Sequence, residues 1–440
     1  MARKDPNRNL PFTREMTQLD QELPAVLKDY RTASWEAVQE TPLPTVKDED
    51  WRRTPLARFD FNTVEVANGK YGQEPPSIPE QAILSGAITS DKPLAVLQAS
   101  GIRFENTSHL EKQGVIFSSL TDAARDHPEL VGKVLGKVVS PQDGVFAAAV
   151  GAFSHQGIFL YVPKGVVVEE PIFGLAISPG GKSAHFFQTV IYLEEGAAAN
   201  YLQETLSLPG SDSSPLAGEN LEVIVGPSAK LQITELENYG EDVWSFGHKR
   251  AKVERDGRLE WEIGALGAQL SKHFVTIDLI GTGAEGRVSG ILFTDGDQHL
   301  TYNTMQRHLA PRTTSDLLFK GALTGSSRTV WRGMIYVAEG ARFIDGYQAN
   351  RNLVLDPDAR SDSIPGLEIL NNDVRCTHGS TVGKIDQEEL FYLLSRGITR
   401  DQAEQLIIQG FFNDVIVRFS IPEVGELFWD RIKNRLLSRG

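Results

Sequence analysis

Residues 274–293 of this chain read FVTIDLIGTGAEGRVSGILF. Residues 274–280 and 287–293 are rich in β-branched and aromatic side chains, which is typical of two strands. Between them, Gly281 to Gly286 match the dinucleotide-binding fingerprint letter by letter. That fingerprint requires a helix next, because the helix N-terminus holds the pyrophosphate, whereas here a second strand follows. The segment therefore predicts a strand, a tight glycine turn and another strand.

The same pattern of strand-like runs and turns extends from about residue 144 to residue 370. Short β-branched or aromatic runs alternate with Gly, Pro or Asp turns, and helical periodicity is nearly absent. A region of this length and pattern fits a sandwich, a large barrel or a solenoid. The units are roughly 10 residues long and lack strong hairpin signals such as Asn-Gly, which favours a parallel β-helix. Further runs of this kind lie at 157–162, 189–193, 221–225 and 330–337.

The flanks of this region read as helical. We predict an N-terminal helical region with a linker over residues 1–100, a β-helix core over 101–383 and a C-terminal helical domain over 384–440. Prolines among polar residues indicate the linker near 70–90. Apolar and polar residues at helical spacing indicate a helical insert in the core near 119–135.

Cap residues mark the helix boundaries of the C-terminal region. Asp386 can cap a first helix, which ends at Gly397. Thr399 caps the next helix, and Gln402 completes a capping box. Pro422 begins the last helix. The apolar stripes of these helices either dock a partner or pack on the core of the chain itself.

Composition excludes several classes of function. With 40% hydrophobic and 23% charged residues among 440, the chain is typical of a soluble globular protein with two or three folded regions. A formal charge of −14 argues against a nucleic-acid-binding surface, which needs an excess of Lys and Arg. We expect neither a membrane-spanning helix nor a signal peptide, because no apolar run is long enough. One cysteine forms no intrachain disulfide and suits the reducing cytoplasm.

The one cysteine, Cys376, lies two positions before His378. The segment around them, which starts at Asn371, is rich in turn formers, and we expect a turn there. A thiolate and an imidazole this close together can serve iron, zinc or redox chemistry. A closed metal site needs four ligands, however, and this spacing offers two. From the spacing alone, a structural role is favoured over a metal site.

Other motifs of chemistry are absent from the sequence. No glycine-rich loop ends in Gly-Lys-Ser or Gly-Lys-Thr, so we expect this chain to bind no nucleotide itself. His299 and His308 flank Asn303 and Gln306, and a polar turn explains this group as well as a site does. The many carboxylates leave open a carbohydrate-cleaving β-helix enzyme, with paired carboxylates or a calcium ion in a groove.

A series of short motifs follows a fixed order along nearly the whole chain. They are EDWRRTPL at 49–56, YVPKGV at 161–166, EPI at 170–172, HLAP at 308–311 with Ser315 and Lys320, QANRNL at 348–353, PGLEI at 365–369, CTHGST at 376–381, LFYL at 390–393 and SRGI at 395–398. Their order and extent, more than any single one, resemble the SufB/SufD family of iron–sulfur cluster assembly proteins, and within it the SufD branch.

The resemblance implies a right-handed parallel β-helix core between N-terminal and C-terminal α-helical regions. It also implies assembly with a SufB-like scaffold subunit and a SufC-like ATPase. In this resemblance the ATPase is expected to bind the ATP and to dock on the helices of residues 384–440. The two β-helix chains meet through the ends of their β-helices, near Cys376 and His378.

The residues that distinguish the SufD branch from the SufB branch determine which cluster ligands this chain can offer. SufB-like chains carry a cysteine where this chain has Ser361, and a Glu-His-Glu triplet where it has Thr377-His378-Gly379. The resemblance implies that His378 supplies an imidazole to a transient iron–sulfur cluster shared with the SufB-like partner. Cys376 is a second candidate ligand or a supporting thiol. We therefore expect a scaffold subunit and not an enzyme; a self-sufficient homodimer that uses Cys376 and His378 twice is the alternative.

Overall fold

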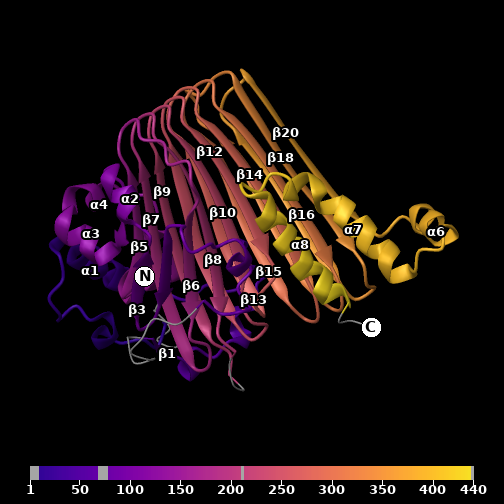
Figure 1. Cartoon of the computed structure of the whole chain (residues 1–440), viewed down its shortest axis with the longest axis horizontal. Coiled ribbons are helices and arrows are strands. Elements are labelled where there is room, and N and C mark those ends of the chain that lie inside the picture. The colour runs from indigo at the N-terminus through magenta and orange to yellow at the C-terminus, as the bar shows by residue number, and fades with distance from the viewer. Residues whose placement is uncertain (1–8, 68–77, 210–212, 438–440) are drawn as a thin grey trace.

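The computed structural model describes residues 9–67, 78–209 and 213–437. Two sheets face each other along the middle of the chain and form a β-solenoid of about 8 turns, with helices before and after it (Figure 1). The expected fold class is confirmed: a mainly β chain built on a parallel β-helix between helical ends. Residues 1–8 and residues 70–77 of the expected linker lie outside the described residues.

From β5 onward, consecutive strands alternate between the two sheets, so two strands make one turn of the solenoid. Sheet A contains β1 (Glu65–Val66), β4 (Ile116–Ser119), β5 (Gln156–Val162), β7 (Ser183–Leu193), β9 (Leu216–Val225), β11 (Trp244–Val253), β13 (Leu270–Leu279), β15 (His299–His308), β17 (Arg328–Val337) and β19 (Arg360–Ile369). Sheet B contains β2 (Leu94–Gln98), β3 (Gly101–Glu105), β6 (Ile172–Ser178), β8 (Ala198–Ser207), β10 (Lys230–Asn238), β12 (Arg258–Ala265), β14 (Glu285–Thr294), β16 (Thr314–Leu323), β18 (Ile344–Val354) and β20 (Val374–Gly383).

The register between turns is regular. Leu270 pairs with His299, and His299 pairs with Arg328, so each of these turns adds 29 residues to the chain. Because side chains of a strand alternate between its two faces, every second residue points into the space between the sheets. Trp261 and Trp331 are among the largest side chains buried there.

One corner residue in each of seven successive turns has a left-handed backbone, with φ between 54° and 75°. Each of these residues donates its backbone N–H to a carbonyl in the corner of the next turn, at 2.7–3.1 Å. The corners therefore stack with the same regularity as the strands. The residues are Gly165, Gly196, Ser228, Asp256, Gly283, Arg312 and Phe343.

The glycine turn predicted at 281–286 joins β13 to β14, as expected. Gly283 holds the left-handed corner position, with φ of 75°. A Cβ atom built on Gly281 would lie 1.9 Å from the backbone nitrogen of Arg255 in the preceding turn. The close approach of two stacked corners thus requires glycine here, and a strand stands where a dinucleotide site needs a helix.

A charged cluster is buried inside the β-helix, around Lys249 of β11. Its Nζ lies 2.8 Å from Glu237 Oε1, 2.9 Å from Glu235 Oε1 and 3.4 Å from Glu219 Oε2. Burial by itself lowers the pKa of Lys249, but the neighbouring glutamates outweigh it and raise that pKa well above its usual value. Burial outweighs the attraction of Lys249 and raises the pKa of the Glu219 carboxyl above its usual value. The sequence pattern gave no indication of this cluster.

Helices cover the outer face of sheet A at the start of the solenoid. α1 packs on α5, and Arg31 of α1 donates to the carbonyl of Ser154 at 2.9 Å. Further along, Trp51 lies with its ring 5.9 Å from that of Phe246 and 6.1 Å from that of Phe274. The α-helices of this region are α1 (Ala25–Glu40), α2 (Ser108–Lys112), α3 (Leu120–Asp126), α4 (Pro128–Val134) and α5 (Val145–Phe153), and the 3₁₀ helices are η2 (Arg14–Thr17), η3 (Glu49–Trp51), η4 (Leu56–Arg58), η5 (Phe61–Thr63), η6 (Leu84–Gly86) and η7 (Pro141–Asp143).

The C-terminal helices begin where their caps predict. Asp386 accepts from the backbone N–H of Glu388 at the start of α6 (Gln387–Ser395), and Thr399 forms a capping box with Gln402 at the start of α7 (Arg400–Ile416). Pro422 begins α8 (Pro422–Leu437). α7 and α8 lie along the outer face of sheet B, whereas α6 projects from the body (Figure 1). None of the helices in the described ranges combines the length and the apolar character needed to cross a lipid bilayer.

Replacing Gly281 by alanine should destabilise the β-helix by about 1–3 kcal/mol, because the added Cβ meets backbone atoms that cannot rotate away. The fall in Tm in a thermal scan measures the effect. Gly410→Ala is the matched control, since a Cβ at this position of α7 meets nothing within 4 Å and alanine favours the helix. Equal melting temperatures for Gly281→Ala and the unmodified chain would contradict the stacking of corners described above.

Candidate functional site

The two ends of the solenoid differ. At the N-terminal end, the short strands β3 and β4 pair antiparallel with β2 and β5, and the rings of Phe104 and Phe117 meet across this end at 5.1 Å. At the other end, the two sheets finish with β19 and β20, ten residues each. Within the described residues, β19 pairs only with β17 and β20 only with β18. The C-terminal end therefore presents two long strand edges with unpaired backbone groups.

Cys376 and His378 lie on β20, at this bare end. The turn expected at 376–381 is wrong: the turn is confined to the corner before Val374, and the two residues belong to the strand. Asn371 and Asp373 form the corner, with the Asn371 side-chain oxygen accepting from the Asp373 N–H at 2.9 Å. Pairing with β18 overrides the turn preference of the glycine and serine residues that follow.

Both side chains face the space between the sheets. Cys376 packs against an apolar cluster around Ile335, Val337 and Ile344, which line this space. His378 is two residues further along the strand, so it points to the same face, with its Cα about 7 Å from that of Cys376. Burial raises the pKa of the half-buried Cys376 thiol above its usual value. His378 is exposed because no further turn covers it.

His308 lies beside Cys376, although the two are far apart in sequence. A Cβ built on Gly346 of β18 would lie 3.2 Å from Cys376 Sγ and 3.3 Å from His308 Nε2. Because Gly346 has no side chain, a small space remains at this position, and the Cys376 thiol and the His308 imidazole both border it. Of the two interpretations of the group from His299 to His308, the polar turn is wrong, since residues 299–308 form β15. Leu300 and Tyr302 share the alternate positions of Gln306 and His308, and this period of two could have indicated a strand that carries all four residues on its inward face.

The hydrogen bonds of His308 fix its tautomer. Thr313 donates its hydroxyl to the carbonyl of Ala310 at 3.2 Å, so it accepts from Nδ1–H of His308, 2.7 Å away. Nε2 then accepts from the Ser315 hydroxyl at 2.9 Å, and Ser315 accepts from the Gln306 amide at 2.7 Å. Burial lowers the pKa of His308 to about 4, so the imidazole is neutral near pH 7. This arrangement holds a neutral imidazole beside the thiol.

Other residues named from the sequence lie elsewhere. Ser361 is the second residue of β19 and accepts a hydrogen bond from Thr329 at 3.0 Å, whereas Cys376 packs beside Ile369 at the far end of that strand. The structure therefore does not bring Ser361 and Cys376 together. His299, at the opposite end of β15 from His308, is buried, and burial lowers its pKa to about 3.

The ligand set at the bare end is incomplete. In the parts of the chain that the structure describes, no group of three or more His, Cys, Asp or Glu side chains is placed to hold a metal ion. Cys376 and His378 supply two donors from one strand, and a four-coordinate iron site needs two more. Cys376 and His378 are therefore two side chains with donor atoms on an edge strand that no other described strand covers.

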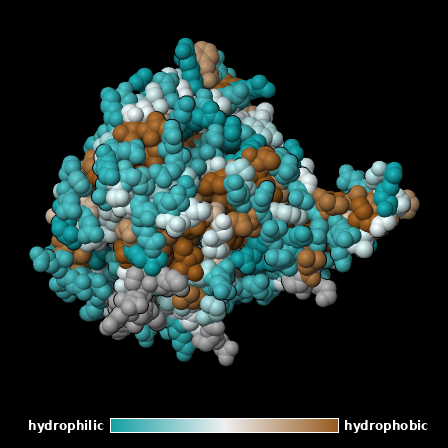
Figure 2. Space-filling view, in the orientation of Figure 1, coloured by the Kyte–Doolittle hydropathy of each residue, from teal (hydrophilic) through white to brown (hydrophobic). Residues whose placement is uncertain are grey.

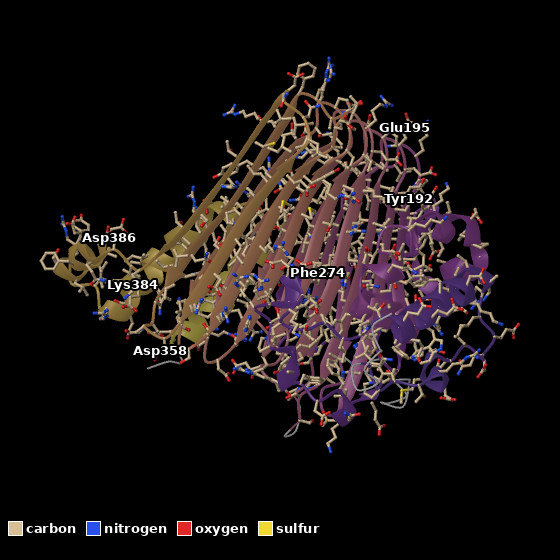
Figure 3. All side chains as sticks on the ribbon, turned by 180° about the vertical axis from the view of Figure 1, so that it is seen from behind. Tyr192, Glu195, Phe274, Asp358, Lys384 and Asp386 are labelled. Atoms are coloured by element: carbon tan, nitrogen blue, oxygen red, sulfur yellow. The ribbon has the colours of Figure 1, made fainter. Side chains whose placement is uncertain are left out.

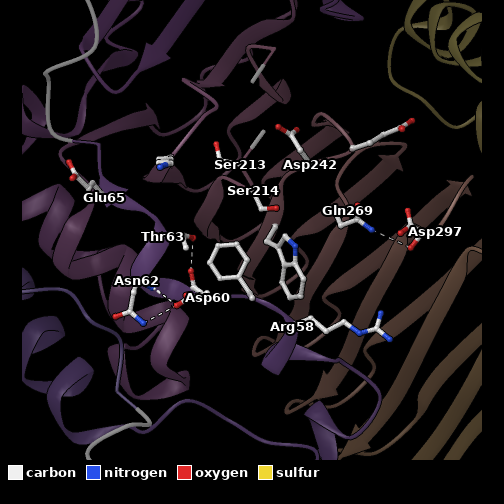
Figure 4. A pocket seen from close by; sticks show the side chains of 14 residues that line it. Arg58, Asp60, Asn62, Thr63, Glu65, Ser213, Ser214, Asp242, Gln269 and Asp297 are labelled. Atoms are coloured by element: carbon white, nitrogen blue, oxygen red, sulfur yellow. Dashed lines mark hydrogen bonds between the residues drawn. The ribbon is translucent and has the colours of Figure 1, made fainter. Parts of the chain in front are cut away.

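An open groove lies far from this end, next to the N-terminal region (Figure 4). Its wall includes the carboxylates of Asp60, Asp242 and Asp297, which Figure 4 shows on separate segments around the groove. Asp60 accepts hydrogen bonds from the backbone and side chain of Asn62 at 3.0 and 2.8 Å. These hydrogen bonds lower the pKa of the Asp60 carboxyl, whereas the general acid of glycoside cleavage has a raised pKa.

The projecting α6 carries a second exposed feature. Phe391 is 71% exposed, Tyr392 56% and, on the adjoining α7, Leu406 49%. Apolar residues are visible on this arm in Figure 2. Figure 3 shows Lys384 and Asp386, in the link from β20 to α6, on the opposite side of the molecule from Tyr192. The arm therefore extends from the same end of the solenoid as the bare strands.

Two family models match this chain. One, described as SUF system FeS cluster assembly, SufBD core domain, matches residues 176–411. The other, the SufBD protein N-terminal region, matches residues 9–173. The chain belongs to the SufBD family of iron–sulfur cluster assembly proteins.

Staphylococcal members of the SufBD family are similar over much of their length. An iron–sulfur cluster assembly SufBD family protein of Staphylococcus epidermidis is 32% identical over 302 residues, which cover 69% of this chain and 65% of the relative, just under two thirds of its length. Proteins of the same description from Staphylococcus saprophyticus and Staphylococcus aureus are each 28% identical over 412 residues, covering 91% of this chain and 87% of the relative.

Cys376 should react more slowly with iodoacetamide in the folded chain than in the urea-unfolded chain at the same pH. Burial raises the pKa of its thiol, and the thiolate is the form that reacts. The pH at half-maximal rate should accordingly be higher for the folded chain. Mass spectrometry measures the rate without ambiguity, because the chain has one cysteine. Identical rate–pH profiles in the two states would contradict the packing of the thiol.

Proposed function

We propose that this chain is a SufD-type subunit of a SUF complex, a non-catalytic scaffold that holds half of a site for a nascent iron–sulfur cluster. One observation carries the proposal: inward-facing His378 and Cys376 lie on β20, whose outer edge has no partner strand among the described residues. A transient cluster is cargo, and it needs thiolate together with nitrogen or oxygen ligands. The ligands missing here would come from the chain that covers this edge.

The residues around His378 support the SufD branch over the SufB branch. Thr377 and Gly379 stand where SufB-like chains carry glutamates, and Ser361 stands where they carry a cysteine. In this proposal His378 supplies the imidazole, and Cys376 is a second ligand or a supporting thiol. The SufB-type partner supplies a thiolate and a carboxylate. The Cys376 thiol must stay reduced to bind iron, and the cytoplasm is a compartment in which thiols stay reduced.

The exposed apolar surface of α6 and α7 is the proposed docking site of a SufC-type ATPase. It includes the exposed Phe391, and the hollow between the two helices is lined by Tyr392, Leu393, Leu406 and Ile407, with acidic residues beside them. ATP would bind to that partner and not to this chain. A partner held on the projecting α6 can turn relative to the solenoid, whereas α7 is fixed on sheet B.

Contacts between α7 and sheet B would carry such a movement into the β-helix. Lys320 of β16 donates from its Nζ to the carbonyl of Phe411 at 2.5 Å and lies 2.5 Å from the carboxylate of Asp414. Arg418, just after α7, donates to the Ser289 hydroxyl at 2.9 Å. In sheet B, β16 pairs with β18, which pairs with β20. Closure of the ATPase would thus act within two strands of His378.

His378→Ala should leave the complex with SufB-type and SufC-type partners intact but reduce cluster assembly at least several-fold, because it removes a ligand without touching the core. Gel filtration reports the complex, and the visible absorbance after anaerobic reconstitution with iron and sulfide reports the cluster. Thr377→Ala is the matched control, since its side chain faces away from the site.

Two outcomes would contradict this assignment. Undiminished assembly in His378→Ala would remove His378 from the site. A stable cluster on the wild-type chain alone would support a self-sufficient homodimer instead of a subunit that depends on a partner.

Phe391→Glu should abolish co-purification of the SufC-type ATPase while leaving the fold unchanged, because Phe391 is mostly exposed and a buried carboxylate is costly at an interface. Circular dichroism checks the fold, and a pull-down measures binding. Val46→Glu introduces the same charge at an exposed apolar residue of the N-terminal region and should bind the ATPase normally. Retention of the ATPase by Phe391→Glu would place its docking site elsewhere.

A further inference from the structure

Phe343 occupies a backbone conformation that bulky residues rarely adopt. It is the last of the seven stacked left-handed corners, with φ of 60°. The other six carry Gly, Ser, Asp or Arg, and a Phe at such a position is an uncommon outlier. Its backbone N–H donates to the carbonyl of Asp373 at 2.7 Å, so the corner is held by the same ladder as the others. The stacking thus fixes a strained backbone at this residue.

The side chain of Phe343 is not buried in the core. It is 66% exposed, although a phenyl ring of this size is usually buried. A glycine, or a short polar residue such as Ser228 or Asp256 at earlier corners, would satisfy the turn with less strain. The combination of left-handed backbone and exposed ring is therefore not explained by the stability of this chain.

Phe343 lies at the rim of the bare end. Its corner leads into β18, and the corner stacked on it, residues 370–373, leads into the edge strand β20. Leu370 in that last corner is 51% exposed, and Leu367 and Val382 on the edge strands are 37% and 52% exposed. An apolar rim thus accompanies two long edges of unpaired backbone.

The unpaired backbone groups of these edges indicate which kind of chain can cover them. Unpaired N–H and C=O groups along two ten-residue edge strands, one in each sheet, are satisfied by extended backbone from another chain. A second β-helix of the same family, which ends in strand edges of its own, can cover both at once. A flat helical surface cannot satisfy these backbone groups.

We propose that Phe343 is the anchor residue that a partner β-helix grips when it stacks on β19 and β20. This inference rests on the proposed function, because it takes the SufB-type chain as the partner. The ring enters an apolar recess at the facing corner of that partner, and the left-handed backbone holds it outward before binding. The free chain thus carries the strained backbone of Phe343, and the ring makes its contact only when the partner binds.

Phe343→Gly should leave the stability of the free chain unchanged or higher while weakening its binding to the partner. In the free chain it should melt no lower than the wild type, because glycine accepts the left-handed backbone. Its Kd for the purified SufB-type chain should rise roughly 10- to 100-fold, the loss expected for burying one phenyl ring. Calorimetry measures both quantities on the full-length chain. Ser228→Gly makes the same backbone change at an exposed corner four turns from Phe343 and should leave the Kd unchanged.

Three results would overturn the anchor. A Kd for Phe343→Gly within about threefold of the wild type would show that the ring is not gripped. A clearly lower Tm for both Phe343→Gly and Phe343→Asn, which also suits a left-handed corner, would show that the ring serves the fold. Failure of the wild-type chain to bind any SufB-type chain would instead refute the proposed function, and gel filtration of the wild type shows this before any variant is compared.

Discussion

Backbone pairing between successive turns is the interaction on which this structure depends. Each inner strand satisfies its N–H and C=O groups with the strands one turn before and one turn after it, and one corner in each of seven turns does the same through a left-handed residue. Such a ladder has no natural end, so a β-helix must close its edges or share them. This chain closes the N-terminal edge with short antiparallel strands and helices, whereas no described strand pairs with the outer edges of β19 and β20 at the C-terminal end.

The bare edge links the fold to the proposed chemistry. His378 and Cys376 are inward-facing residues of an edge strand, so they border the interior of the solenoid and remain reachable by another chain. A complete ligand set inside one chain would hold a cluster firmly, whereas a set divided between two chains can open when their interface moves. The missing ligands are thus consistent with a scaffold that must release what it assembles.

Much of the fold could be predicted from the sequence, because its signals are local. Alternating strand runs, the turn at Gly281 and the caps at Asp386 and Thr399 depend on a few neighbouring residues. The turn expected at Cys376 was wrong because pairing with β18 outweighs local preference. The position of His308 beside Cys376 could not be predicted, since it depends on the register of strands several turns apart, which corner lengths set.

Hydrogen–deuterium exchange tests the central claim, that the C-terminal end of the β-helix is an unfinished edge which a partner completes. In the free chain, amides of β19 and β20 should exchange fastest among the long strands of the solenoid, and in the complex with the SufB-type chain they should become protected. The strands at the N-terminal end should exchange equally in both samples. A complex that forms while the amides of β19 and β20 stay unprotected, or one that protects the N-terminal end instead, would contradict the account.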